Sequence, residues 1–395
     1  MSSGSKIEYQ KKELPSKVQS VGLLLTVLGL VIVLAGYFVS PARMAFNNII
    51  GLTFIISIAV GALFFVAIEY LSGAVWSTPF RRVSEIISSF VVLVPLIVIP
   101  LLFNLHSVFH WTHPEVVNAD KVLSEKAPYL NINFFVIRIA AFIAIWMLFQ
   151  YLITRNSLRQ DSTKDQTLTT KNVKLSAVFI PFFALTISFT GIDWLMSLEP
   201  HWFSTIFGIY YFSGTVLAAL ATITYVAVTL NENGFLVKGL TTDHYYSMGA
   251  LLFAFINFWA YIAFSQFLLV WYANLPEETF WFLQRWEGSW IIWTVGLMVV
   301  HFLVPYFGLL SQPSKMNPAK LKFFALWILA AHYYDLYFLV MPNYSRSGVA
   351  LSWYELGFPI LLVGLMILLF VSKSKKQNLV PVGDPKLKRG IDFRL

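Results

Sequence analysis

The sequence contains no cysteine and few charged residues. Only 12% of its 395 residues are Asp, Glu, Lys or Arg, and 57% are hydrophobic, whereas about 25% are charged in a typical soluble protein. So few charges cannot cover the surface of a water-soluble protein of 45.0 kDa, which predicts a polytopic membrane protein. The absence of cysteine excludes disulfides, cysteine-ligated zinc, iron–sulfur clusters and covalently attached c-type haem on this chain.

Long apolar runs predict an all-α integral membrane protein with ten transmembrane helices. A spanning helix needs about 20 mostly apolar residues, and the first such run lacks a small-residue cleavage site, so we expect it to remain as a span. Residues 1–17 are predicted to form an N-terminal segment, 18–372 the membrane domain and 373–395 a basic tail, with both terminal segments at the surface. The predicted spans are 18–40, 47–75, 84–105, 131–154, 174–197, 203–230, 246–272, 288–311, 320–342 and 350–372.

The Lys and Arg residues are distributed unevenly between the predicted loops. With the N-terminus in the cytoplasm, 22 of the 28 basic residues lie in cytoplasmic segments, five lie on the opposite side, and Arg138 lies within a span. Because basic residues are retained on the cytoplasmic side of a membrane, both termini are predicted to be cytoplasmic. This asymmetry also accounts for the net charge of +8, so we expect lipid rather than nucleic acid as the partner of the basic residues.

Ionisable residues in or beside the spans are the candidate functional residues, because a charge inside a membrane is costly. By depth they form an outer group toward the non-cytoplasmic side and an inner group that includes Glu69, with His301 nearer the middle. No glycine-rich phosphate loop, G-x-S-x-G or HExxH motif is present, so protons and lipophilic ligands are the expected chemistry. The candidates for proton transfer are Glu69, Asp193, His301, His332, Asp335 and Glu355, and those for a quinone pocket or an ion pair are Arg138 and His201.

Each candidate also has a structural interpretation. Arg138 can pair with Asp193 or with Asp335, and an ion pair of this kind holds helices together without doing chemistry. Glu69 has no evident cationic partner within the membrane, and a lone buried carboxyl can exchange protons. Glu355 begins the last span, where it can either serve a proton route or extend to water.

Two histidines and one carboxylate in the eighth and ninth spans suggest more specific chemistry. His332 and Asp335 are three residues apart, so they share one helix face, and this pair can accept a proton and a hydrogen bond from a quinol hydroxyl. His301 and His332 both fall near the middle of the membrane, where facing histidines can ligate a b-type haem. Their expected depths differ by about 4.5 Å at 1.5 Å per residue, which disfavours haem.

Three stretches resemble one known family. They run from Gly61 to Tyr70 in the second span, from Asp193 to Gly208 between the fifth and sixth spans, and from Phe264 to Thr279 at the end of the seventh. Together they resemble the NrfD/polysulfide-reductase-like membrane subunits of bacterial alternative complex III, and in particular the shorter of its two such subunits. The resemblance covers nearly the whole chain.

The resemblance implies a fold of two four-helix bundles, spans 2–5 and 6–9, flanked by spans 1 and 10. It implies a non-redox subunit of a quinol-oxidising respiratory complex in the bacterial inner membrane, which passes electrons to a cytochrome c or to an oxidase. The expected partners are a paralogous NrfD-like subunit, an iron–sulfur subunit and c-type cytochrome subunits. The expected ligand is a quinone such as menaquinone. In that complex the larger paralogue is the better candidate for the quinol site, so proton routes are implied here more directly than a quinone pocket.

Two other functions remain open from the residues. Ten spans with buried carboxylates also suit an ion-coupled secondary transporter, although the sequence shows no matching pair of spans interrupted by glycine or proline. A purely structural anchor for peripheral redox subunits would use every buried charge in an ion pair. Redox-bearing partners would distinguish the respiratory subunit from the transporter, and proton-coupled turnover would distinguish it from the anchor.

Overall fold

The computed structural model describes residues 9–395, so residues 1–8 of the predicted N-terminal segment lie outside the described residues. The described residues are all-helical, with no strand, and ten helical segments are long and apolar enough to cross a membrane. This confirms the predicted class and number of spans. The uninterrupted helices are α1 Ser16–Val39, α2 Pro41–Ser72, α8 Ile132–Thr163, α9 Thr167–Trp194, α10 Phe207–Glu232, α11 Thr242–Ala273, α16 Pro318–Val340 and α17 Gly357–Lys376.

Side-chain caps and prolines define several helix starts. The Asn131 side chain accepts a hydrogen bond from Phe134 N at 2.9 Å, which fixes the start of α8. The α16 helix begins at Pro318, at a position whose N–H has no partner within a helix. The α2 helix ends at Ser72, and the next residue, Gly73, has a φ of 67°, the left-handed conformation that glycine adopts at little cost. Local signals of this kind set helix ends independently of hydropathy, and the observed ends differ from the hydropathy limits by up to nine residues, at the end of α8.

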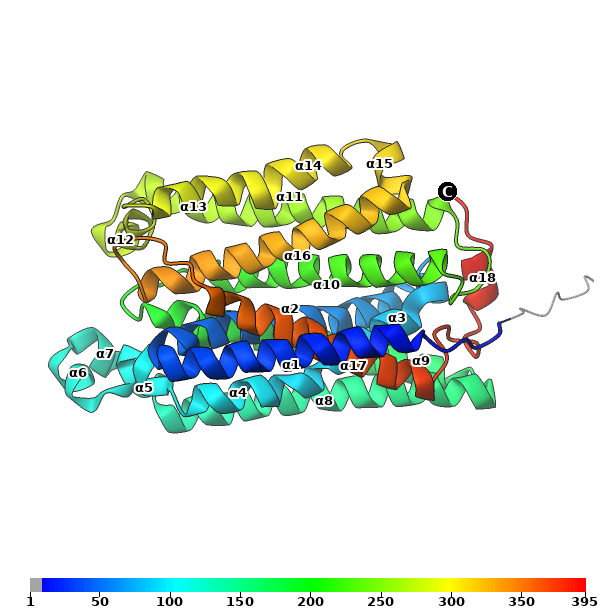
Figure 1. Cartoon of the computed structure of the whole chain (residues 1–395), viewed down its shortest axis with the longest axis horizontal. Coiled ribbons are helices and arrows are strands. Elements are labelled where there is room, and N and C mark those ends of the chain that lie inside the picture. The colour runs from blue at the N-terminus through cyan, green and yellow to red at the C-terminus, as the bar shows by residue number, and fades with distance from the viewer. Residues whose placement is uncertain (1–8) are drawn as a thin grey trace, which may run out of the picture.

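The α2 and α10 helices form the centre of the molecule. They pack against each other, α2 also contacts α3, α9 and α16, and α10 also contacts α9, α11 and α16. The α1 helix runs along α17 (Figure 1). Small residues permit this close approach, since a Cβ on Gly29 would lie 2.3 Å from Leu361 N and one on Gly364 would lie 2.4 Å from Thr26 N.

The third and eighth spans each change helix type part-way along. The third consists of η1 Thr78–Phe80, α3 Arg81–Ser88, η2 Ser89–Leu93 and α4 Val94–Leu102. The eighth consists of α13 Trp290–Leu297, the π-helical turn η5 Met298–Leu303 and α14 Val304–Leu309. Pro305 has no N–H to donate to the preceding turn, and the indole of Trp327 instead donates to the Val300 carbonyl at 2.8 Å.

The connections divide the molecule into two ends. One end carries the short helices α5 Leu105–Val108, η3 His110–Thr112, α6 Pro114–Ala119, α7 Lys121–Lys126 and α12 Pro276–Gln284 (Figure 1). The other, here called the basic end, carries α15 Gln312–Met316, α18 Leu387–Ile391 and the C-terminus. The chain enters α1 at the basic end as well, which agrees with an even number of spans.

The C-terminal tail was predicted to lie at the surface, but it packs against the helices. Val380 and Leu387 are buried, and Asp384 forms an ion pair with Arg81 of α3 at 2.5 Å. The Gly383 N–H donates to Asp161 of α8 at 3.1 Å, and His244 Nε2 lies 2.8 Å from the Gly390 carbonyl oxygen. The tail therefore connects three spans across the basic end.

The absence of cysteine makes the membrane orientation directly testable. We expect the exposed variant Glu125→Cys, in the segment between the third and fourth spans, to react with a membrane-impermeant maleimide in intact cells. Lys376→Cys, exposed at the basic end, should react only after the cells are permeabilised, because basic loops remain cytoplasmic. The cysteine-free parent is the control, and the reverse labelling pattern would contradict the predicted orientation.

Candidate functional site

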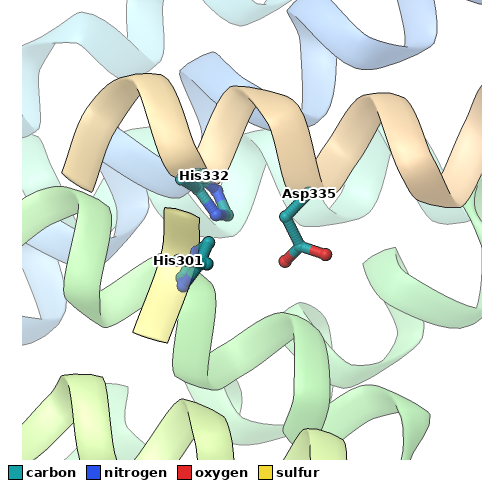
Figure 2. Close-up of side chains that lie close together, drawn as sticks. All are labelled: His301, His332 and Asp335. Carbon is teal, nitrogen blue, oxygen red and sulfur yellow. The ribbon is translucent and has the colours of Figure 1, made fainter. Parts of the chain in front are cut away.

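The structure brings together three of the predicted site residues. His301 on η5 lies beside His332 and Asp335 on α16 (Figure 2). One potential ligand atom from each lies within 4.8 Å of the others, and each residue is about 1% exposed. The shared face predicted for His332 and Asp335 is confirmed, and the eighth span supplies the third member of the cluster.

Both carboxylate oxygens of Asp335 accept hydrogen bonds. The Tyr210 hydroxyl of α10 donates to Oδ1 at 2.5 Å, and the Trp259 indole of α11 donates to Oδ2 at 3.1 Å. No Lys or Arg side chain of the described residues lies within ion-pair distance of Asp335. The carboxyl group is therefore held by neutral donors, so its charge is not fixed by a neighbouring cation.

His332 is oriented by the central helix α2. Its Nε2 lies 3.0 Å from Ser57 Oγ, and Ser57 donates its own proton to the Thr53 carbonyl at 2.8 Å. This arrangement makes Nε2–H the donor and leaves Nδ1, which has no partner, as a free acceptor. Gly214 leaves room for the ring, because a Cβ there would lie 2.8 Å from His332 Cε1.

His301 sits in the π-helical turn of the eighth span. Its ring stacks on Trp259 with centroids 3.8 Å apart, and the two histidine rings lie 6.4 Å apart. Neither His301 nitrogen has a hydrogen-bond partner. A buried polar group without a partner costs about 1–3 kcal/mol, and π-helical turns are frequent at functional sites. Both features mark His301 as more than a packing residue.

The geometry of the cluster suits proton transfer better than it suits the binding of a metal ion or a haem. One potential ligand atom of each residue lies within 4.8 Å of the others, which is near the spacing that a shared Zn²⁺ requires. Asp335 would, however, have to exchange its present donors for a metal. For haem, the 6.4 Å between the two rings suits an iron atom, but neither histidine lines the large cavity described next. The absence of haem b therefore stays a prediction.

A cavity of about 480 Å³ lies beside the cluster. Its wall is almost entirely apolar and aromatic, and it includes Tyr210 and Trp259, the two donors to Asp335. Phe264 and Met298 also line the cavity and are 60% and 54% exposed on the outer face of the helices. The cavity therefore faces the lipid, and its size falls within the range of about 300–1,000 Å³ that is usual for small-molecule sites.

Tyr210 and Trp259 were not predicted as site residues. Tyrosine and tryptophan in a membrane protein usually serve as anchors at the membrane interface, so their presence alone does not indicate a site. Trp259 lies 17 residues into a helix that begins at Thr242, which is too deep for an anchor. This depth is the signal that could have identified it.

Arg138 and Asp193 form an ion pair, which selects one of the two partners predicted for Arg138. Arg138 Nε donates to Asp193 Oδ2 at 2.8 Å and Nη2 donates to Oδ1 at 3.1 Å. The Tyr129 hydroxyl donates to the same carboxylate at 2.9 Å. Asp193 is fully engaged by these donors and does not belong to the cluster around Asp335.

Glu355 and Glu69 each have a cationic neighbour. Glu355 is buried rather than extended to water, and its Oε1 lies 2.6 Å from Nε of Arg43. Glu69 lies 3.9 Å from Nε of Arg81, which corrects the expectation that no cation is near it. Because Arg81 binds Asp384 more closely, Glu69 is left without a hydrogen bond at the basic end.

His201 lies at the end of the molecule opposite the basic end. Its Nε2 is 2.6 Å from Asp120 Oδ2, and its Nδ1 is 3.6 Å from Glu199. The hydrogen bond with His201 lowers the pKa of Asp120. The side chain of His201 is 42% exposed, so it joins two surface segments and does not reach the cavity.

No protein-family model matches the chain, and no curated protein has a similar sequence. The fold and the site define a class of protein: an all-helical, multi-pass membrane protein with a lipid-facing aromatic cavity beside a buried carboxyl–histidine cluster.

Proposed function

We propose that the chain binds quinol as the membrane subunit of a bacterial quinol-oxidising complex of the NrfD-like type. One observation carries the proposal: a lipid-facing aromatic cavity whose wall contains a tyrosine hydrogen-bonded to a buried carboxyl group. A quinol reaches its site from the bilayer, so the site needs an apolar entrance. It also needs a group that accepts the hydroxyl proton when the ring is oxidised.

Tyr210 and Asp335 can together receive that proton. Tyr210 donates to Asp335, and its hydroxyl oxygen can accept a hydrogen bond from a ligand in the cavity. When the ligand O–H bond breaks, its proton passes to the Tyr210 oxygen while the Tyr210 proton passes to Asp335. The net change is one new O–H bond on Asp335, and the free Nδ1 of His332 is a further acceptor in the same cluster.

The electrons leave through partner subunits, since this chain has no cysteine to hold an iron–sulfur cluster or a c-type haem. An iron–sulfur subunit, c-type cytochromes and the paralogous NrfD-like subunit are the partners that the proposal requires. The proposal places the complex in the inner membrane with both termini of this chain cytoplasmic. Glu69, unbonded at the basic end, would serve protons from the cytoplasmic side.

The helix contacts suit the two-bundle arrangement that the proposal includes. The second to fifth spans contact one another through α2, α3, α8 and α9, and the sixth to ninth through α10, α11, η5 and α16. The α1 and α17 helices pack together and touch mainly α2 and α3 of the first group. Spans 2–5 and 6–9 would therefore be the two bundles, with spans 1 and 10 flanking them.

Two neighbouring tyrosines allow a matched test. We expect Tyr210→Phe to lower the rate of quinol oxidation by the purified complex about 100-fold, as the loss of a proton-transfer group does. Tyr211→Phe is the control, because Tyr211 is equally buried but donates to the Thr53 carbonyl and does not line the cavity. It should change the rate less than threefold. Equal effects of the two variants would contradict the proposal.

The secondary transporter remains the second candidate, and one observation favours it. The third and eighth spans occupy matching places in two halves of five and both change helix type part-way along, and matching irregular spans are a feature of many carriers. Co-purification separates the candidates. A carrier would be isolated alone, whereas the proposed subunit would bring partners with the absorbance of haem and iron–sulfur centres.

A further inference from the structure

Arg285, predicted to lie in a loop, is a fully buried cation directly behind the cavity wall. Its exposed fraction is 0%. Its guanidinium stacks on Trp281 at 3.4 Å, and it donates to the carbonyl oxygens of Phe338 at 3.3 Å and Leu339 at 3.0 Å. Trp281, Phe338 and Leu339 all line the cavity. Arg285 is therefore separated from a ligand in the cavity by a single layer of residues.

No carboxylate of the described residues lies within ion-pair distance of Arg285, whose hydrogen bonds all go to backbone carbonyls. Burial lowers the pKa of its guanidinium, but three acceptors and the face of an aromatic ring stabilise the cation, and arginine stays protonated in proteins. The charge of Glu199 acts on Arg285 from beyond ion-pair distance and raises its pKa, but Glu199 is bound to Arg346 at 3.2 Å. The site thus contains one positive charge without a counter-ion of its own.

The remaining titratable groups around the cavity are Tyr210, His301 and Asp335. None of the residues that line the cavity carries a formal charge. Asp335 lies behind Tyr210, so the carboxyl group and Arg285 flank the same apolar space. When a ligand hydroxyl gives its proton to Asp335 through Tyr210, the negative charge moves from Asp335 to the ligand in the cavity, in front of the wall residues that contact Arg285.

We propose that Arg285 makes the cavity selective for an aromatic ligand with an ionised ring oxygen. Such a ligand is an acidic hydroxyquinone, or the anion that remains after a quinol loses one proton. This inference rests on the proposed function, since it assumes that the cavity accepts a quinone-like ring. Arg285 does not touch the ligand, because one layer of wall residues lies between them. Its positive charge acts on the ligand across that layer, so Arg285 is a positioning residue.

Two probes of nearly equal shape test the inference. A 2-hydroxy-3-alkyl-1,4-naphthoquinone can ionise, and its 2-methoxy ether cannot. Binding to the purified full chain is measured by quenching of tryptophan fluorescence, because Trp259, Trp281 and Trp286 line the cavity. We expect the ionised hydroxy compound to bind at least about tenfold more tightly than the ether, the effect of one additional favourable charge interaction.

The Arg285 variants decide the cause of any preference. Arg285→Gln should bind both probes equally, with the affinity for the ether unchanged, whereas Arg285→Lys should retain most of the preference. A preference that persists in Arg285→Gln would overturn the inference. Should this variant fail to fold, the wild type decides instead: affinity for the hydroxy probe must rise as the probe ionises, and a fall would overturn the inference.

The two proposals fail in different ways. If the wild type binds both probes without preference, the selectivity is wrong and the quinone-like cavity stands. If the wild type binds neither probe, the cavity does not accept a quinone and both proposals are wrong. Asp335→Asn is a second check. It removes a carboxylate whose negative charge repels an ionised probe, so this probe should bind the variant at least as tightly as the wild type.

Discussion

Replacement of Arg138 by methionine is expected to lower the free energy of unfolding by about 3–5 kcal/mol, because it leaves the buried charge of Asp193 without its partner. The ion pair has two hydrogen bonds of 2.8 and 3.1 Å, and the guanidinium also lies 3.9 Å from the centre of the Tyr129 ring. Asp193 is 1% exposed, so water cannot replace the arginine. Reversible unfolding of the purified protein in detergent, followed by circular dichroism, measures the change.

The double variant Arg138→Met/Asp193→Leu separates the loss of the pair from the burial of a lone charge. Because apolar residues often replace a buried ion pair at little cost, most of the lost stability should return. Arg155→Met is the control, since Arg155 lies exposed on the same helix and its loss should cost within about 0.5 kcal/mol. If the double variant is no more stable than Arg138→Met alone, the charge of Asp193 is not the cause.

Asp335→Asn is expected to give the largest loss of activity, a fall in the rate of quinol oxidation of about 10²–10⁴-fold. The amide cannot take up the proton that the proposed mechanism passes through Tyr210. Its NH₂ group is a hydrogen-bond donor, so it cannot accept the hydrogen bond that the Tyr210 hydroxyl or the Trp259 indole gives to Asp335. Steady-state oxidation of a soluble quinol analogue by the purified complex, at equal subunit content, is the measurement.

Loss of activity must be separated from loss of assembly. Asp243→Asn changes a carboxylate near the basic end of α11, at the start of the helix that carries Trp259, and should leave the rate unchanged. Subunit stoichiometry and haem content should be normal in both variants. A complex that contains Asp335→Asn and still oxidises quinol at the normal rate would favour the purely structural anchor over the proposed function.

Local sequence properties determined the all-helical class and the number of spans. In a bilayer each backbone N–H and C=O must be satisfied within its own segment, so an apolar run of sufficient length becomes a helix whatever its neighbours are. The number of spans could therefore be read from hydropathy alone. The pairing of His332 with Asp335 on one face is equally local, because residues three apart on a helix are neighbours.

Tertiary structure alone decided which groups surround the site. Tyr210 donates to Asp335 across 125 residues of sequence, and Arg81 pairs with Asp384 across 303, so no local pattern contains these contacts. Arg138 had two possible partners by depth, and only helix packing selected Asp193. The cavity and the buried Arg285 behind it likewise depend on how α10, α11, α13 and α16 pack together. Backbone hydrogen bonds within each helix fix its path locally, whereas each side chain finds its partner only after the helices have packed.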